Sequence, residues 1–152
     1  MIRMMDFRVW DMFLNPPLVA ALAAMASAQV FKTLKPLAKG KVPDLRKIAD
    51  YGGWPSSHTA FISACAIAVG IADGFRSSVF ALAGVVASIL IYDILKMRMV
   101  VSLDGKEIDR LLARSSLERS ERRPQFEGHS LAEVLAGLAW GLAWAIIVCA
   151  LY

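Results

Sequence analysis

The chain has 152 residues, enough for one domain, and 57% of them are hydrophobic, above the roughly 45–50% typical of soluble proteins. Because the apolar residues form long runs, the composition excludes an ordinary soluble protein and indicates an integral membrane protein. The formal net charge is +4, and the 17 basic residues are unevenly spread: six lie in residues 32–47 and eight in residues 96–123.

These basic clusters lie between apolar segments, so we do not expect a nucleic-acid partner. Basic loops of this kind bind anionic headgroups or phosphate, or they signal topology. The positive-inside rule predicts that both loops, about residues 35–55 and 100–128, face the cytoplasm. The two cysteines, Cys65 and Cys149, lie within apolar segments, so free thiols are expected.

Four apolar segments are predicted as transmembrane helices within a single domain, 1–152. The second segment is short for a span, because crossing about 30 Å of hydrocarbon takes about 20 residues. A basic loop with Pro and Gly separates the first two helices, and Asp73–Gly74 makes the tight turn after the second. In chain order the predicted helices cover residues 17–34, 56–72, 77–99 and 130–152.

Residues 100–128 are strongly charged but carry apolar residues at helical spacing. These residues are Ile108, Leu111, Leu112 and Leu117, and the pattern is typical of an amphipathic helix on the membrane surface. The predicted fold class is therefore all-α: a membrane bundle of about four transmembrane helices plus a surface amphipathic helix.

The motif Gly-Gly-Trp-Pro-Ser-Ser-His, residues 52–58, opens the second helix. Pro55 suits the first turn of a helix, and the glycines let the backbone approach a ligand. A helix start offers unpaired N–H groups and a positive dipole end, which suits an anion such as phosphate. Taken alone, the motif favours a serine-capped helix whose His58 is polar filling.

Ionisable residues are costly in a membrane, so their positions call for a reason. Under the predicted topology, each of the four helices brings polar residues to the same membrane face. We expect these helix ends to converge on one site. They are Gln29 and Lys32; Ser56, Ser57 and His58; Asp93, Lys96 and Arg98; and His129 and Glu133.

The fourth helix has the clearest pattern, with His129, Glu133, Gly137 and Gly141 recurring every four residues on one stripe. Glu133 is placed to accept the Nδ1–H of His129 and so to leave Nε2 reactive. The Gly-x-x-x-Gly spacing predicts close packing of a neighbouring helix beneath that pair. Trp140 and Trp144 lie on another face and are interpreted as packing or lipid-facing residues.

Two histidines, a carboxylate, several cations and a donor-rich helix start can together support phosphoryl transfer without a metal or another cofactor. A metal site remains a second possibility, because imidazole and carboxylate are common ligands. We rank it lower, since the nearby cations favour an anion. Its ligands would come from His58, His129, Asp93 and Glu133.

These motifs resemble the superfamily of type 2 phosphatidic acid phosphatases and vanadium haloperoxidases. Pro55 to His58 resembles its Pro-Ser-Gly-His motif, and Arg123, His129 and Glu133 keep the spacing of its last motif. The chain is most similar to a divergent bacterial membrane branch, related to acid phosphatases and vanadium-dependent haloperoxidases. The further motif residues shared with that branch are Gln29, Lys32, Gly53, Asp93, Arg98, Val134 and Gly137.

The resemblance implies that His129 is the nucleophile that forms a phosphohistidine, that Glu133 orients it, and that His58 is the acid for the leaving group. It implies a location in the bacterial inner membrane, with a lipid or polyprenyl phosphate, or a small phosphate ester, as substrate. Phosphate would be bound by Lys32, Ser56, Ser57, Arg98 and Arg123. Gln29, Gly53 and Asp93 would position these residues without contacting the phosphate themselves.

Two functions of other classes fit parts of the sequence. A non-catalytic membrane protein that binds an anionic lipid or phosphate would need the cations but not the histidines. A small transporter subunit would account for Asp93 and Glu133, although the charges cluster at one face of the membrane and do not cross it. Haloperoxidase activity has only the superfamily name in its favour.

Overall fold

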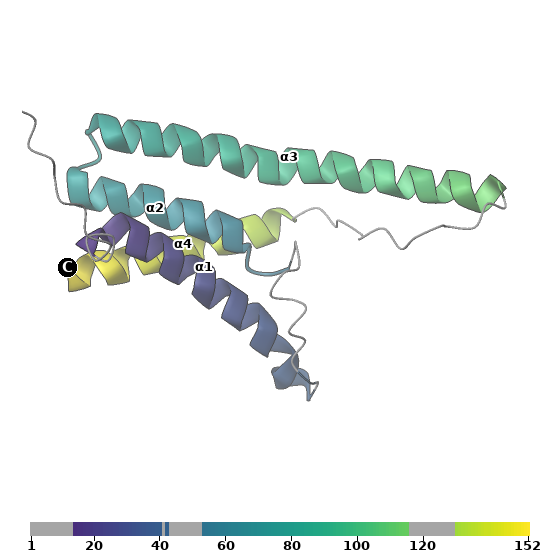
Figure 1. Ribbon diagram of the computed structural model, residues 1–152, viewed down its shortest axis with the longest axis horizontal. Coiled ribbons are helices and arrows are strands. Elements are labelled where there is room, and N and C mark those ends of the chain that lie inside the picture. Colours follow the sequence, from purple (N-terminus) through teal and green to yellow (C-terminus); the bar gives the residue numbers. More distant parts are fainter. Residues whose placement is uncertain (1–13, 41, 43–52, 116–129) are drawn as a thin grey trace, which may run out of the picture.

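The computed structural model describes residues 14–40, 42, 53–115 and 130–152. Its α-helices are α1 (Pro16–Leu34), α2 (Ser57–Asp73), α3 (Ser78–Ser115) and α4 (Leu131–Leu151), and a short 3-10 helix, η2 (Lys35–Lys39), extends α1. Figure 1 shows α2 lying between α3 and the pair formed by α1 and α4. The all-helical bundle predicted from the sequence is confirmed.

Capping side chains, prolines and a glycine mark where the helices begin and end. The Asn15 side chain caps α1 by accepting the N–H of Leu18 at 3.0 Å, and two prolines follow, whose missing N–H groups are not needed in a first turn. Ser77 caps α3 in the same way by accepting the N–H of Phe80 at 3.1 Å. Gly74, at a φ of 89°, ends α2 in the conformation that glycine adopts most easily.

Three of the described helical segments are long and apolar enough to cross a bilayer: Pro16–Ala38, Ser78–Lys96 and Leu131–Leu151. The fourth, α2, has 17 residues and falls short of the usual length, as its sequence indicates. It nevertheless runs alongside the other helices within the bundle (Figure 1). The count of about four spans therefore comprises three full-length helices and one shorter buried helix.

The third helix differs in length from the prediction. It was expected to end near Met99, with a separate surface helix after it, but α3 continues unbroken to Ser115. Residues 97–115 contain no proline and many good helix formers, so nothing in this stretch interrupts the backbone hydrogen bonds. At 1.5 Å per residue its 38 residues extend about 57 Å, and its charged half projects past the other helices (Figure 1).

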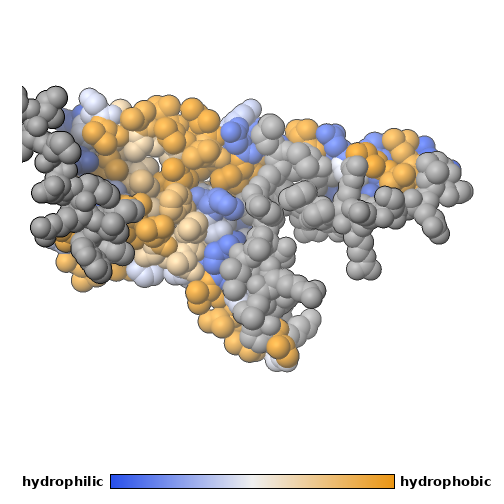
Figure 2. Space-filling view, in the orientation of Figure 1, coloured by the Kyte–Doolittle hydropathy of each residue, from blue (hydrophilic) through white to orange (hydrophobic). Residues whose placement is uncertain are grey.

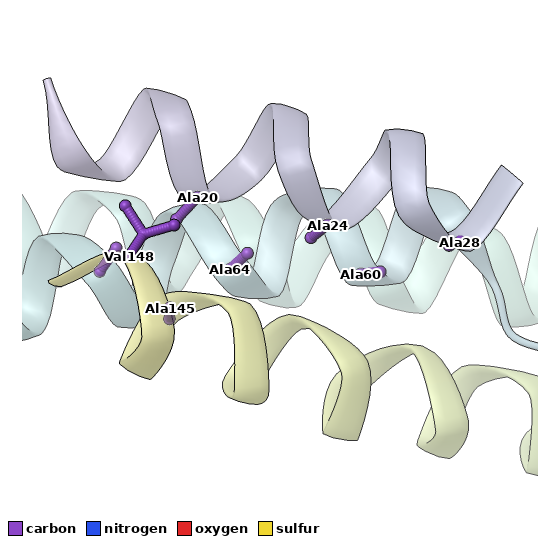
Figure 3. Close-up of a cluster of buried hydrophobic side chains, with 8 residues drawn as sticks. Ala20, Ala24, Ala28, Ala60, Ala64, Ala145 and Val148 are labelled. Atoms are coloured by element: carbon purple, nitrogen blue, oxygen red, sulfur yellow. The ribbon is translucent and has the colours of Figure 1, made fainter. Parts of the chain in front are cut away.

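The core consists almost entirely of alanine. Figure 3 shows the small side chains of α1, α2 and α4 facing one another. Residues four apart on α1 and on α2 form two matching stripes, and small side chains let helix backbones approach closely in a membrane. The buried cluster is Ala20, Ala24 and Ala28; Ala60, Ala64 and Ala68; and Ala145 and Val148.

Candidate anion site at the helix ends

Two interhelical hydrogen bonds join three helix ends at one end of the bundle. The Ser56 N–H donates to the Glu133 carbonyl oxygen at 3.0 Å, which ties the start of α2 to the start of α4. The Lys32 ammonium group donates to Ser57 Oγ at 3.2 Å, which ties the end of α1 to the start of α2. Hydrophilic residues gather at this end in Figure 2, between α1 and the starts of α2 and α4.

Lys32 and Ser57 form the centre of the candidate site. Both are buried, with 8% and 3% of their surface exposed. Ser57 is the first residue of α2, so the Lys32 ammonium group lies at the positive end of a helix dipole. A cation in that position is unfavourable for the helix, whereas an anion there is favourable. The pair therefore has the electrostatics of an anion-binding site.

Gly53 lies directly beside this pair. Its φ is 90°, a conformation that residues with a Cβ rarely adopt, and a Cβ at this position would lie 3.9 Å from Lys32 Cδ. Trp54 and Pro55 follow, joined by a cis peptide bond, and lead into the first turn of α2. The loop before α2 thus brings its backbone against the lysine side chain.

Ser56 is the N-cap of α2. It is 0% exposed, and its Oγ caps α2 by accepting from the N–H of Thr59 at 3.4 Å and from Thr59 Oγ1 at 2.9 Å. The hydroxyl is thus used within the helix start. Contact between Ser56 and phosphate stays a prediction.

His58 lies in the first turn of α2 and is exposed. On α4, Glu133 forms a capping box with Ser130: its Oε2 accepts the Ser130 N–H at 2.9 Å, and its own N–H donates to Ser130 Oγ at 3.3 Å. This bond places the carboxylate at the very start of α4. The expected contact with His129 stays a prediction, because His129 lies outside the described residues.

The other predicted site residues differ in how far the structure describes them. Gln29 is half-buried on α1, one turn before Lys32, and Asp93 is exposed on α3. Within the described residues, no hydrogen bond or ion pair joins Asp93 to the other helices. Arg98 belongs to α3, but its side chain is outside the description, as is the whole of Arg123. The described residues also contain no group of three His, Cys, Asp or Glu side chains that could hold a metal ion.

The glycine seam predicted on α4 is confirmed. A Cβ on Gly137 would lie 2.6 Å from the Ser56 carbonyl oxygen, and one on Gly141 would lie 2.6 Å from the Ala60 carbonyl oxygen. Both distances are too short for any side chain. Hydrogen atoms in place of side chains are therefore what allows α4 to lie against the start of α2.

An aromatic cluster beside the site was not predicted. Phe31 packs against both Trp54 and Trp140, with ring centroids 5.7 Å and 5.4 Å apart, and Trp140 donates from Nε1 to Ser27 Oγ at 2.8 Å. The packing role expected of Trp140 is thus confirmed. The sequence signal that could have indicated this cluster is proximity to the site residues, because Phe31 precedes Lys32 and Trp54 comes two residues before Ser56.

A model of the divergent PAP2 family matches residues 13–144. The chain is 25% identical over 152 residues to the uncharacterized membrane protein YuiD of Bacillus subtilis, covering 91% of this chain and 96% of that protein. No solved structure matches. The family match confirms the resemblance found in the motifs, and the apolar helices together with a membrane-protein relative support an integral membrane protein.

Proposed function

The chain belongs to the divergent PAP2 family, and from that premise we propose that it is a metal-independent membrane phosphatase. Its substrate is a phosphate monoester or pyrophosphate, of which a lipid or polyprenyl phosphate is the leading class. The site faces the cytoplasm from the inner membrane of a bacterium. The observation that carries the proposal is the buried Lys32 ammonium group, 3.2 Å from Ser57 Oγ at the positive end of α2.

In this proposal the phosphate group binds at the Lys32–Ser57 pair, where the ammonium group and the first N–H groups of α2 neutralise its oxygens. Arg98 and Arg123 add positive charge from the neighbouring segments. Glu133 holds the imidazole of His129 with Nε2 directed at phosphorus. Binding thus orients the ester and stabilises the charge that develops on its equatorial oxygens.

Two displacements then complete hydrolysis. In the first, His129 Nε2 forms a bond to phosphorus as the bond from phosphorus to the ester oxygen breaks, and His58 gives its proton to the leaving alcohol. In the second, neutral His58 takes a proton from water, whose oxygen attacks phosphorus and breaks the P–N bond. The products are the alcohol and inorganic phosphate, and both imidazoles return to their starting states.

Phosphate release by the purified protein from lipid and soluble phosphate esters tests the proposal. Activity that withstands EDTA, is inhibited by vanadate and is lost in His129→Ala and His58→Ala is expected. Glu107→Gln is the matched control, because Glu107 is an exposed residue whose ion pair with Arg110 lies on the projecting half of α3. Full activity in His129→Ala would exclude the phosphohistidine mechanism.

A non-catalytic anion-binding protein is the second candidate, because the Lys32–Ser57 pair and the start of α2 need no histidine to attract phosphate. Vanadate or phosphate would then raise the unfolding temperature without any turnover. His129→Gln would retain that shift. Turnover that depends on His129 distinguishes the two candidates.

A further inference from the structure

Three aromatic rings from three parts of the chain meet beside the Lys32–Ser57 pair. Phe31 comes from α1, Trp54 from the loop before α2 and Trp140 from α4, and Phe31 lies between the other two. These three residues are called the aromatic wall below. Lys35 Nζ lies 5.3 Å from the centroid of the Trp54 ring, within the range of a cation–π contact.

The aromatic wall is held in place from both sides. Trp140 is anchored to α1 by its hydrogen bond to Ser27, and its ring supports that of Phe31. Phe31 in turn meets Trp54 edge-on, with an interplanar angle of 61°. The three rings therefore support one another, and Trp140 links them to α1.

The outer part of the wall remains open although its inner part is packed. Trp54 is 43% exposed and Phe31 36% exposed. Both are close in sequence to residues of the anion site, since Phe31 precedes Lys32 and only Pro55 separates Trp54 from Ser56. An ester whose phosphate binds at the Lys32–Ser57 pair therefore has an apolar surface within reach of its carbon chain.

We propose that the aromatic wall binds the hydrocarbon segment next to the phosphate of an amphiphilic phosphate ester, and so selects such esters over small polar ones. The inference rests on the proposed function for the headgroup. Aromatic rings offer a large rigid apolar area, and each buried methylene group favours binding. A role as an interfacial anchor alone is the competing outcome.

The first experiment compares hexyl phosphate with methyl phosphate, two soluble monoesters that differ only in chain length. Wild-type protein should show a higher kcat/KM for hexyl phosphate than for methyl phosphate, and Trp54→Ala should reduce the ratio of the two values about tenfold. Phe75→Ala is the matched control. It also removes one exposed ring from an edge-to-face pair, that of Phe75 and Phe80, at the opposite end of α2.

The second experiment detects binding by tryptophan fluorescence, a readout that does not require turnover, in a protein that retains Trp54. Trp10 and Trp144 are not part of the aromatic wall, so both are replaced by phenylalanine to leave only the fluorescence of Trp54 and Trp140. In this background, ω-bromohexyl phosphate should quench tryptophan fluorescence saturably, because its bromine atom would lie near the wall. The matching alcohol, ω-bromohexanol, should not quench at the same concentrations. Adding Trp54→Phe to this background should remove most of the quenching.

The outcomes separate this inference from the proposed function. Saturable, phosphate-dependent quenching without hydrolysis would support the aromatic wall and overturn the phosphatase. Hydrolysis with equal preference for both esters, unchanged in Trp54→Ala, would overturn the wall and leave the phosphatase standing. Equal quenching by the bromoester and the bromoalcohol would assign the wall to bilayer anchoring only.

Discussion

The backbone N–H of Ser56 donates to the backbone carbonyl oxygen of Glu133 at 3.0 Å, so the first residues of α2 and α4 are joined directly. These two helix starts carry the residues expected to bind and to attack phosphate, in segments that lie more than 70 positions apart in the sequence. The glycine seam of α4 continues the contact along α2. The precision of the candidate site therefore depends on how closely these two helices pack.

Gly137→Ala should separate the two helix starts. Its new Cβ would lie 2.6 Å from the Ser56 carbonyl oxygen, so the free energy of unfolding should fall by about 1–3 kcal/mol. Gly84→Ala is the matched control, because a Cβ on this glycine of α3 meets nothing within 4 Å. That variant should be neutral or more stable, since alanine favours helix. Equal effects of both substitutions in reversible unfolding would argue against the seam.

Lys32→Met should abolish the rise in unfolding temperature that vanadate produces, because the buried cation at the start of α2 is removed. Without ligand, the same variant should be as stable as the wild type or more stable by about 1 kcal/mol, since a cation is unfavourable at a helix N-terminus. Lys106→Met, at an exposed position on α3, should leave both values unchanged. A vanadate response retained in Lys32→Met would remove Lys32 from the site.

Thr59→Val should destabilise the protein by about 1–2 kcal/mol, because it removes the 2.9 Å bond from Thr59 Oγ1 to the fully buried Ser56 Oγ. Thr59→Ser keeps the hydroxyl and should recover most of the loss. Denaturant unfolding of the two variants measures the difference. If valine and serine prove equally stable, the hydroxyl contact contributes nothing.

Trp140→Phe and Ser27→Ala each break the 2.8 Å bond that anchors the aromatic wall to α1. A double-mutant cycle should give a coupling energy of about 0.6 kcal/mol, the average for such bonds between transmembrane helices. Trp144→Phe paired with Ser27→Ala should show no coupling. A coupling near zero for Trp140 as well would mean that the bond does not stabilise the wall.

The sequence was sufficient for much of the fold, because the signals are local. The Asn15, Ser56 and Ser130 positions are polar residues placed just before apolar runs, and all three cap helices in the structure. The continuation of α3 to Ser115 was missed because the change from apolar to charged residues resembled a boundary. A change of composition alters what surrounds a helix but does not end its hydrogen bonding.

The site was only partly predictable. The pattern of polar residues predicted that four helix ends converge, and hydrogen bonds join those of α1, α2 and α4. Convergence of α3 stays a prediction, and the spacing of glycines indicated a close seam. The pattern did not indicate that Lys32 would meet Ser57, because that contact joins two helices. The role of His129 stays a prediction that the experiments above address.

By itself, the sequence determined the membrane class, the helices and the candidate chemistry, since hydrophobic run length, capping residues and motif spacing act over a few residues. Only the tertiary structure decided which groups touch. The Lys32–Ser57 pair, the Ser56–Glu133 bond and the aromatic wall each join segments from different helices. Their contacts depend on how closely alanine and glycine allow the backbones to approach, and that distance is a property of the packed bundle.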